Sequence, residues 1–310
     1  MKIMQIELID TFLDLCETKS FNRTAERLGV TQSTVSGRVR SLEASVGVKL
    51  FQRSRSGTAL TTQGLRFEPH ARSLRHDWVT AKNAAQDTAL AGVTMRIGIQ
   101  HDLVGIDIKA LIGRLREILP DTAFLLEADY SIQMCSDLII GKQDIAILYS
   151  PQIQPDLYFE TLGDVRYVMV STQADTLAAI RKETYILANY SASFANAHAA
   201  LLPDLTHVSL SIGQNAAMVD LLTSLSGTAY VLEHSAKALV AAGVCQKVMD
   251  APTIDQSVFV GVNVRNRHRA AYRKLIKTLH EQYPSQQAHG RARLERPGLS
   301  DTNGPSGQKP

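Results

Sequence analysis

Residues 31–40, TQSTVSGRVR, place hydrogen-bonding side chains along one side of a short predicted helix. Val35, Val39 and Leu42 recur at i, i+4 and i+7, which predicts a buried stripe on the other side. The Gln32 amide can pair with adenine through two hydrogen bonds, and the Arg40 guanidinium can pair with guanine in the same way. The stretch therefore predicts a helix with one face for packing and one face for recognising the edges of bases.

Hydroxyl and basic side chains around this helix are suited to contact a nucleic-acid backbone. Thr31 is positioned to cap the helix, and the free N–H groups beside it favour a phosphate. Two further arginines lie in a short ribbon predicted around Ser56-Gly57, where we expect backbone or minor-groove contacts. The candidate DNA-contacting residues are Thr31, Gln32, Ser33, Thr34, Ser36, Arg38, Arg40, Arg53 and Arg55.

A polar helix face with a few arginines is common on any protein surface, so the order of the surrounding elements matters more. A helix is predicted over residues 5–18, and a second begins after Ser20 and stops at Gly29. The helix capped by Thr31 then ends before Gly47 and is followed by the ribbon. Helix, short turn, capped helix and basic ribbon together predict a winged helix-turn-helix over residues 1–61.

The charge is distributed unevenly along the 310 residues. Residues 1–60 hold 9 Lys and Arg against 6 Asp and Glu, whereas residues 93–285 hold 16 against 19. A polyanionic partner therefore suits the N-terminal part and not the central part.

Residues 62–91 predict a long linker helix. Apolar residues recur in it with alternating spacings of 4 and 3, as in a coiled-coil seam, at Phe67, Ala71, Leu74, Trp78, Ala81 and Ala85. A seam of this length predicts pairing with a second copy of the chain. The alternative is a single helix that packs on its own domain.

Residues 92–284 alternate between short apolar runs and helical patterns of 10–16 residues, which predicts an α/β domain of βαβ units with parallel strands. The length and the proline-rich stretch PQIQP at 151–155 predict two subdomains with the chain passing between them there. Residues 285–310 are rich in Gly, Pro and polar residues, which is typical of a disordered tail.

A small molecule is expected between two such subdomains, at strand ends and helix starts. Free N–H groups at helix starts favour a carboxylate. Each candidate is by itself an ordinary loop or cap residue, and only their convergence on one cleft would be informative. The candidates are Gln100, His101, Asp102, Ser150, Ser171, Thr172, Ser191, Ser193 and Gln214.

Other chemistry has little support. The sequence has no GxSxG, GxxxxGK[ST], GxGxxG or HExxH motif, and its three cysteines and nine histidines are scattered. We therefore expect no metal, no cofactor and no catalysis. The first residues, MKIMQIELIDTFLDL, indicate an amphipathic helix and not a signal peptide, and the sequence contains no apolar run of about 18 residues. We accordingly expect no membrane contact and a reducing cytoplasm.

The stretch AERLGVTQSTVSGRVRSLEASVGVKLFQR, followed by LTTQG, resembles the N-terminal signature of LysR-type transcriptional regulators. The resemblance is close from residue 6 to about 66, general to 90, and one of architecture over 93–283, with echoes such as GKQDIAIL and GTAYVLEHSAKALVAAG. It implies a winged helix-turn-helix, a dimerising linker helix and an effector domain of two subdomains that resembles periplasmic binding proteins. Members of that family are generally bacterial cytoplasmic homodimers or homotetramers whose contacts with promoter DNA change when a metabolite binds.

By position, the resemblance puts Gln32, Ser33 and Ser36 at base-recognising and phosphate-contacting positions, and Arg53 at the wing arginine. Gly37 departs from the family, because relatives often have Arg there. Either the adjacent Arg38 makes a backbone contact from the flank, or the helix recognises a different base. Thr24 replaces the usual Ala, which we interpret as a packing variation.

The hypothesis is thus a sequence-specific DNA-binding regulator modulated by a small-molecule effector. Two alternatives remain at the level of sequence. One is a constitutive DNA-binding repressor without ligand response. The other is a small-molecule-binding protein or enzyme that uses the N-terminal module only for oligomerisation.

Overall fold

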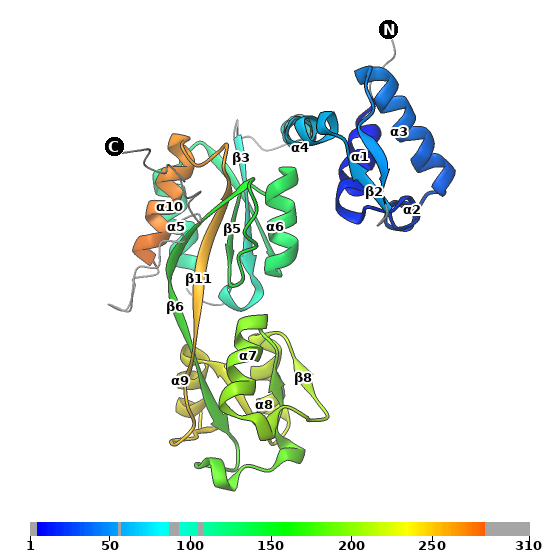
Figure 1. Cartoon of the computed structure of the whole chain (residues 1–310). Coiled ribbons are helices and arrows are strands. Elements are labelled where there is room, and N and C mark those ends of the chain that lie inside the picture. The colour runs from blue at the N-terminus through cyan, green and yellow to red at the C-terminus, as the bar shows by residue number, and fades with distance from the viewer. Residues whose placement is uncertain (1–4, 55–56, 87–92, 105–107, 283–310) are drawn as a thin grey trace, which may run out of the picture.

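The computed structural model describes residues 5–54, 57–86, 93–104 and 108–282 (Figure 1). The predicted tail at 285–310 and the predicted end of the linker helix lie outside these residues. The N-terminal elements are α1 (Ile6–Thr18), α2 (Phe21–Leu28), α3 (Gln32–Val46), β1 (Phe51–Ser54), β2 (Gly57–Leu60) and α4 (Thr62–Gln86). This is the order of helices and ribbon that the sequence predicts for a winged helix-turn-helix.

Local sequence signals set the ends of these helices. Ser20 and Thr31 are the N-caps of α2 and α3, and each side chain accepts a hydrogen bond from a backbone N–H of the first turn. Gly29 and Gly47 end the same helices with φ of 63° and 83°, a left-handed conformation that glycine adopts without steric cost. The turn between α2 and α3 is therefore fixed by residue type.

The core of this domain joins α1, α3, the ribbon and the start of α4. Its fully buried members are Ile9, Phe12, Leu13, Leu42, Leu50 and Ala71. Phe67 of α4 packs edge-on against Phe12, with ring centroids 5.2 Å apart. Two of the six predicted seam residues, Phe67 and Ala71, thus pack within the chain.

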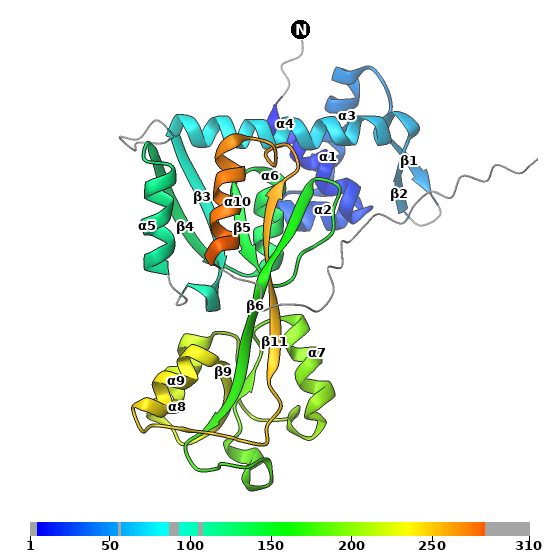
Figure 2. The ribbon, with the colours of Figure 1, turned by 90° about the vertical axis from the view of Figure 1, so that its left-hand side faces the viewer.

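The second half of α4 runs along the α/β domain formed by residues 93–104 and 108–282, called the effector domain below (Figure 2). The His76 ring nitrogen Nδ1 lies 3.3 Å from the carbonyl oxygen of Ile139, and Asn83 donates a 3.3 Å hydrogen bond to the carbonyl of Gly141. The opposite side leaves Leu74 41% and Trp78 52% exposed, with Ala81 and Ala85 also exposed. The seam is therefore divided between an internal contact and an exposed apolar stripe.

The effector domain has two subdomains. The first contains β3 (Val93–Gln100), η1 (His101–Leu103), α5 (Ile108–Ile118), β4 (Thr122–Asp129), α6 (Ser131–Ile140), β5 (Ile145–Leu148) and α10 (Ala270–Gln282). The second contains η2 (Leu177–Ala179), η3 (Lys182–Thr184), β7 (Leu187–Ala188), α7 (Ala192–Leu201), η4 (Pro203–Leu205), β8 (Ser211–Ile212), α8 (Asn215–Ser224), β9 (Thr228–Leu232), α9 (Glu233–Ala241) and β10 (Gln246–Lys247).

Two long antiparallel strands, β6 (Leu157–Ser171) and β11 (Ile254–Asn263), belong to both subdomains (Figure 2). Leu162 of β6 packs in the core of the first subdomain, whereas Tyr167 and Val170 pack in the core of the second. The prediction that the chain crosses at 151–155 was wrong, because that loop connects β5 to β6 before the crossing. The buried residues of β6 thus pass from the core of the first subdomain to the core of the second, and one continuous strand belongs to both.

The seven-stranded sheet has the order β10-β6-β11-β5-β3-β4, and β9 also pairs with β6. Only the pairs of β3 with β4 and with β5 are parallel, and the remaining pairs are antiparallel. The α/β class and the two subdomains agree with the sequence, but the sheet is mixed and not parallel throughout. A separate two-stranded sheet pairs β7 with β8 in parallel.

Candidate nucleic-acid interface and effector site

The outer face of α3 is exposed and its inner face is buried. Val35, Val39 and Leu42 are 0%, 5% and 0% exposed, whereas residues 31–34 are exposed. The Thr31 hydroxyl accepts from the backbone N–H of Thr34 at 3.2 Å and lies 2.8 Å from the hydroxyls of both Ser33 and Thr34. A cluster of three hydroxyls at the start of a helix offers donors to a phosphate oxygen or a base edge.

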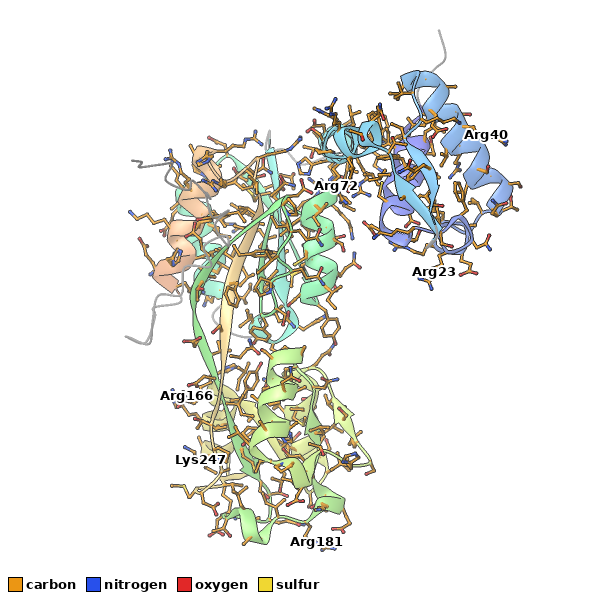
Figure 3. The ribbon with its side chains drawn as sticks, viewed as in Figure 1. Arg23, Arg40, Arg72, Arg166, Arg181 and Lys247 are labelled. Atoms are coloured by element: carbon orange, nitrogen blue, oxygen red, sulfur yellow. The ribbon has the colours of Figure 1, made fainter. Side chains whose placement is uncertain are left out.

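Farther along α3, Ser36 is half-buried and Arg40 is exposed. Figure 3 shows Arg40 on the side of α3 that faces away from the effector domain. A Cβ added to Gly37 would meet no atom within 4 Å, so the backbone at this position is open to an approaching partner. Arg40 therefore presents its guanidinium on the exposed face of α3.

Arg38 lies on a different side of the helix. Its Nη1 donates a 3.3 Å hydrogen bond to the Thr11 hydroxyl of α1, so the guanidinium lies against the protein. A contact between Arg38 and DNA remains a prediction. The backbone of Arg53 pairs with Thr58 in the ribbon, but the side chain of Arg53 and all of Arg55 lie outside the described residues.

Glu43 is a buried acid near the end of α3 that no sequence motif predicted. Its Oε1 accepts from the backbone N–H groups of Leu50 and Phe51 at 2.9 and 3.2 Å, and its Oε2 lies 2.7 Å from Lys49 Nζ. Burial alone would raise the pKa of this carboxyl, but the Lys49 ammonium and the two N–H groups outweigh burial and lower it. Glu43 thus fixes the turn that leads from α3 into the ribbon.

Several predicted effector residues meet at one end of the first subdomain. The buried side chain of Gln100 accepts a 3.0 Å hydrogen bond from the Ser131 hydroxyl at the start of α6. That hydroxyl accepts in turn from the backbone N–H groups of Tyr149 and Ser150 at 3.2 and 3.1 Å. The ring of His101 packs on Tyr130, with centroids 4.8 Å apart.

Asp102 reaches from this end of the first subdomain to the second. Its Oδ1 accepts a 2.7 Å hydrogen bond from the backbone N–H of Asn215, and its Oδ2 accepts a 3.2 Å bond from the Tyr167 hydroxyl. The Tyr149 hydroxyl of the first subdomain lies 3.0 Å from the Tyr167 hydroxyl. Burial raises the pKa of Asp102 to about 6, although these hydrogen bonds oppose the shift.

Ser191 and Ser193 lie at the start of α7. Both hydroxyls donate 2.6 Å hydrogen bonds to Oε1 of Gln256 on β11, and the Ser191 hydroxyl also accepts from the N–H of Phe194. Gln214 is exposed immediately before α8. Ser191 and Ser193 therefore lie beside β11, and Gln214 belongs to the same subdomain.

Ser171 and Thr172 are not brought together with the other candidates. Ser171 is the last residue of β6 and Thr172 follows it, and β6 runs from the first subdomain to the far side of the second (Figure 1). Ser171 accepts a 2.7 Å hydrogen bond from Thr228, and Thr172 exchanges hydrogen bonds with the backbone of Gly227. The rule that placed them at the ligand site holds for parallel strands, and β6 is antiparallel to its neighbours.

Within the described ranges, no three His, Cys, Asp or Glu side chains gather as possible metal ligands. Among the described helices, none combines the length and apolarity that a bilayer span requires.

Comparison with known proteins assigns the family. Residues 6–65 match the family model described as bacterial regulatory helix-turn-helix protein, lysR family, and residues 90–284 match the LysR substrate binding domain. The chain belongs to the LysR family. The LysR-family assignment agrees with the order of α1 to β2 and with the two subdomains joined by β6 and β11.

One relative of this LysR-family chain is the HTH-type transcriptional regulator HdfR of Salmonella typhimurium (strain LT2), which is 37% identical over 126 residues. The match covers 40% of this chain and 45% of HdfR, so the chain spans less than half the length of this relative.

Two solved structures are similar to almost the whole chain. ArgP from Mycobacterium tuberculosis has a TM-score of 0.53 at 19% identity, covering 92% of this chain and 100% of ArgP. DarR from Vibrio fischeri, solved in complex with DNA, has a TM-score of 0.51 at 19% identity, covering 91% of this chain and 100% of DarR. At this level of identity the likeness concerns the fold, and it extends over both LysR domains.

Proposed function

We propose that this LysR-family protein is a bacterial cytoplasmic transcriptional regulator that recognises DNA with the exposed face of α3. The proposal rests chiefly on one observation: Val35, Val39 and Leu42 anchor the helix, while the Gln32, Ser33 and Arg40 side of the same helix is exposed. An α-helix held in this way can enter a major groove and present amide and guanidinium groups to base edges.

Gel shifts against the DNA upstream of the protein's own gene test this proposal. Binding should be selective over random DNA of equal length, and its affinity should fall as salt rises, because phosphate contacts release counterions. Arg40→Ala should weaken binding to that DNA by about tenfold or more and reduce selectivity at one base pair, since a bidentate contact discriminates by roughly 1–3 kcal/mol.

Arg181→Ala is the matched control. Arg181 is an exposed arginine at the far end of the second subdomain, so the substitution removes the same charge away from α3 (Figure 3). Its binding should match that of the wild-type protein. Equal affinity of the wild-type protein for specific and random DNA would contradict the proposal.

We propose that the effector domain binds a small molecule between its two subdomains, and that this binding, not a catalytic reaction, modulates DNA binding. Two sets of contacts support this proposal. Asp102 of the first subdomain accepts hydrogen bonds from Asn215 and Tyr167. Ser191 and Ser193 of the second subdomain bond to Gln256 of β11, so a ligand beside these residues would contact both halves. A carboxylate is the ligand class that the helix start at α8 favours. A panel of small carboxylates, added to the gel shift, tests whether DNA affinity responds.

We also propose that the protein is a homodimer through α4. The exposed stripe of Leu74 and Trp78 lies opposite the face that packs on α6, so it remains accessible to a second copy. Light scattering during gel filtration distinguishes a dimer from a monomer and from the homotetramer that two such dimers would form.

A further inference from the structure

The Asp102 carboxylate accepts a hydrogen bond from the backbone N–H at the start of α8, which would otherwise be open to an external anion. The N–H of Asn215 is the first of α8, a position at which a helix offers no internal acceptor. Its acceptor is Oδ1 of Asp102, 2.7 Å away, on a segment of the other subdomain. Asp102 is 5% exposed, so this contact is shielded from solvent.

The donors around Asp102 are held in place by the second subdomain. The Asn215 side chain donates to the Ser235 hydroxyl at 2.9 Å and accepts from the N–H of Leu232 at 2.8 Å, which fixes the start of α8 against β9 and α9. The Tyr167 hydroxyl is fixed by its ring, which stacks on Tyr190 with centroids 4.7 Å apart. The site is therefore preorganised for two carboxylate oxygens before any external ligand arrives.

We propose that Asp102 is a built-in carboxylate ligand that ties the first subdomain to the second and competes with a carboxylate effector for the same two donors. The regulatory meaning of this proposal rests on the function proposed above, whereas the tie between the subdomains does not. Asp102 then sets the affinity for the effector, because an external carboxylate must displace it before reaching Asn215 and Tyr167.

Two features support displacement. The carboxylate is buried at a desolvation cost, seen in its raised pKa, so its release to water returns part of the free energy that an incoming ligand requires. Asp102 also lies on η1, a single 3-10 turn of 3 residues, whereas Asn215 lies on α8, a regular α-helix of 10 residues.

The test compares Asp102→Ala with Asp102→Asn and uses acetate as the probe. Alanine empties the space between Asn215 and Tyr167, whereas asparagine keeps an oxygen for the Asn215 N–H and fills the space. Acetate at about 100 mM should raise the melting temperature of the full-length Ala variant by about 3 °C relative to chloride at equal ionic strength, as expected for a ligand that binds only the folded state.

The wild-type protein, Asp102→Asn and the control Asp121→Ala should show no acetate effect beyond that of chloride. Asp121 is an exposed acid of the same subdomain, so its variant reports the loss of one charge alone. An Ala variant that ignores acetate, or a wild-type protein that responds equally, would overturn the proposal.

A second measurement on the wild-type protein needs no variant to fold. The Asn215 amide should be protected from hydrogen exchange, although amides in the first turn of a helix usually lack an internal acceptor. Exchange as fast as that of the unprotected first-turn amides would overturn the proposal. Neither the melting test nor the exchange test uses DNA. A protein that fails the gel shift can therefore still pass both tests, and a protein that fails them can still bind DNA selectively.

Discussion

Replacing Glu43 removes the acceptor that holds the turn between α3 and the wing. Glu43→Ala leaves the buried N–H of Leu50 and the part-buried N–H of Phe51 without their side-chain acceptor, and an unsatisfied buried donor costs about 1–3 kcal/mol. The salt bridge to the exposed Lys49 adds about 1 kcal/mol at most. We therefore expect the free energy of unfolding to fall by roughly 3 kcal/mol.

Glu43→Gln is the matched variant, because it keeps an oxygen for both N–H groups and loses only the charge. Its cost should be about 1 kcal/mol, measured by urea unfolding of the full-length protein at pH 7. The pKa of Glu43 lies below its usual 4.5, so the charge stabilises the fold above that pH and the benefit is lost as pH falls through the lowered value. The Gln deficit should therefore shrink in acid.

The Ala variant should also bind DNA more weakly than its stability alone explains, because β1 is no longer anchored to α3. Gel shifts at a temperature where both variants are fully folded measure this effect. An Ala variant as stable as the wild-type protein, or Gln and Ala variants of equal stability, would refute the reasoning about the two backbone donors.

Three further predictions concern single positions. Gly37→Ala should raise the free energy of unfolding by about 1 kcal/mol in a denaturant titration, since alanine favours the helix and its Cβ meets no atom within 4 Å; a less stable variant would contradict this. Trp78→Ala should weaken the homodimer at least about tenfold in sedimentation equilibrium with monomer stability unchanged, while Trp78→Phe should retain it; an unaltered dimer in the Ala variant would argue against the α4 interface. The pKa of Asp102 is raised to about 6 from the usual 3.8, so the folded state binds a proton at Asp102 more tightly than the unfolded state does. The free energy of unfolding of the wild-type protein should therefore rise as pH falls from 7 to 4, by on the order of 2 kcal/mol more than that of Asp102→Asn in urea titrations. Parallel pH profiles of the two proteins would contradict the raised pKa of Asp102.

Local signals made the winged domain predictable. Ser20, Gly29, Thr31 and Gly47 each determine a helix end through their own backbone or side chain, so the sequence was sufficient to locate α2 and α3. Glu43 was missed because its partners are backbone groups seven and eight residues away, and a backbone N–H has no signature in sequence.

The effector domain was harder to predict because its key contacts are long-range. That β6 is one strand shared by both subdomains was not predicted, since its residues pack partly in one core and partly in the other and show no single alternation of buried and exposed positions. Asp102 was named only as one of several loop residues, and its bond to Asn215 joins positions 113 residues apart. Such a pairing depends on how the two subdomains meet at β6 and β11, which no local pattern determines.

The central claim is that the Gln32 and Arg40 side of α3 contacts base edges, and selection of binding sites from randomised DNA tests it most directly. The wild-type protein should select a defined motif, and Gln32→Ala and Arg40→Ala should each lose preference at a different position of that motif while keeping the rest. The same motif, unchanged at every position in both variants, would contradict the claim.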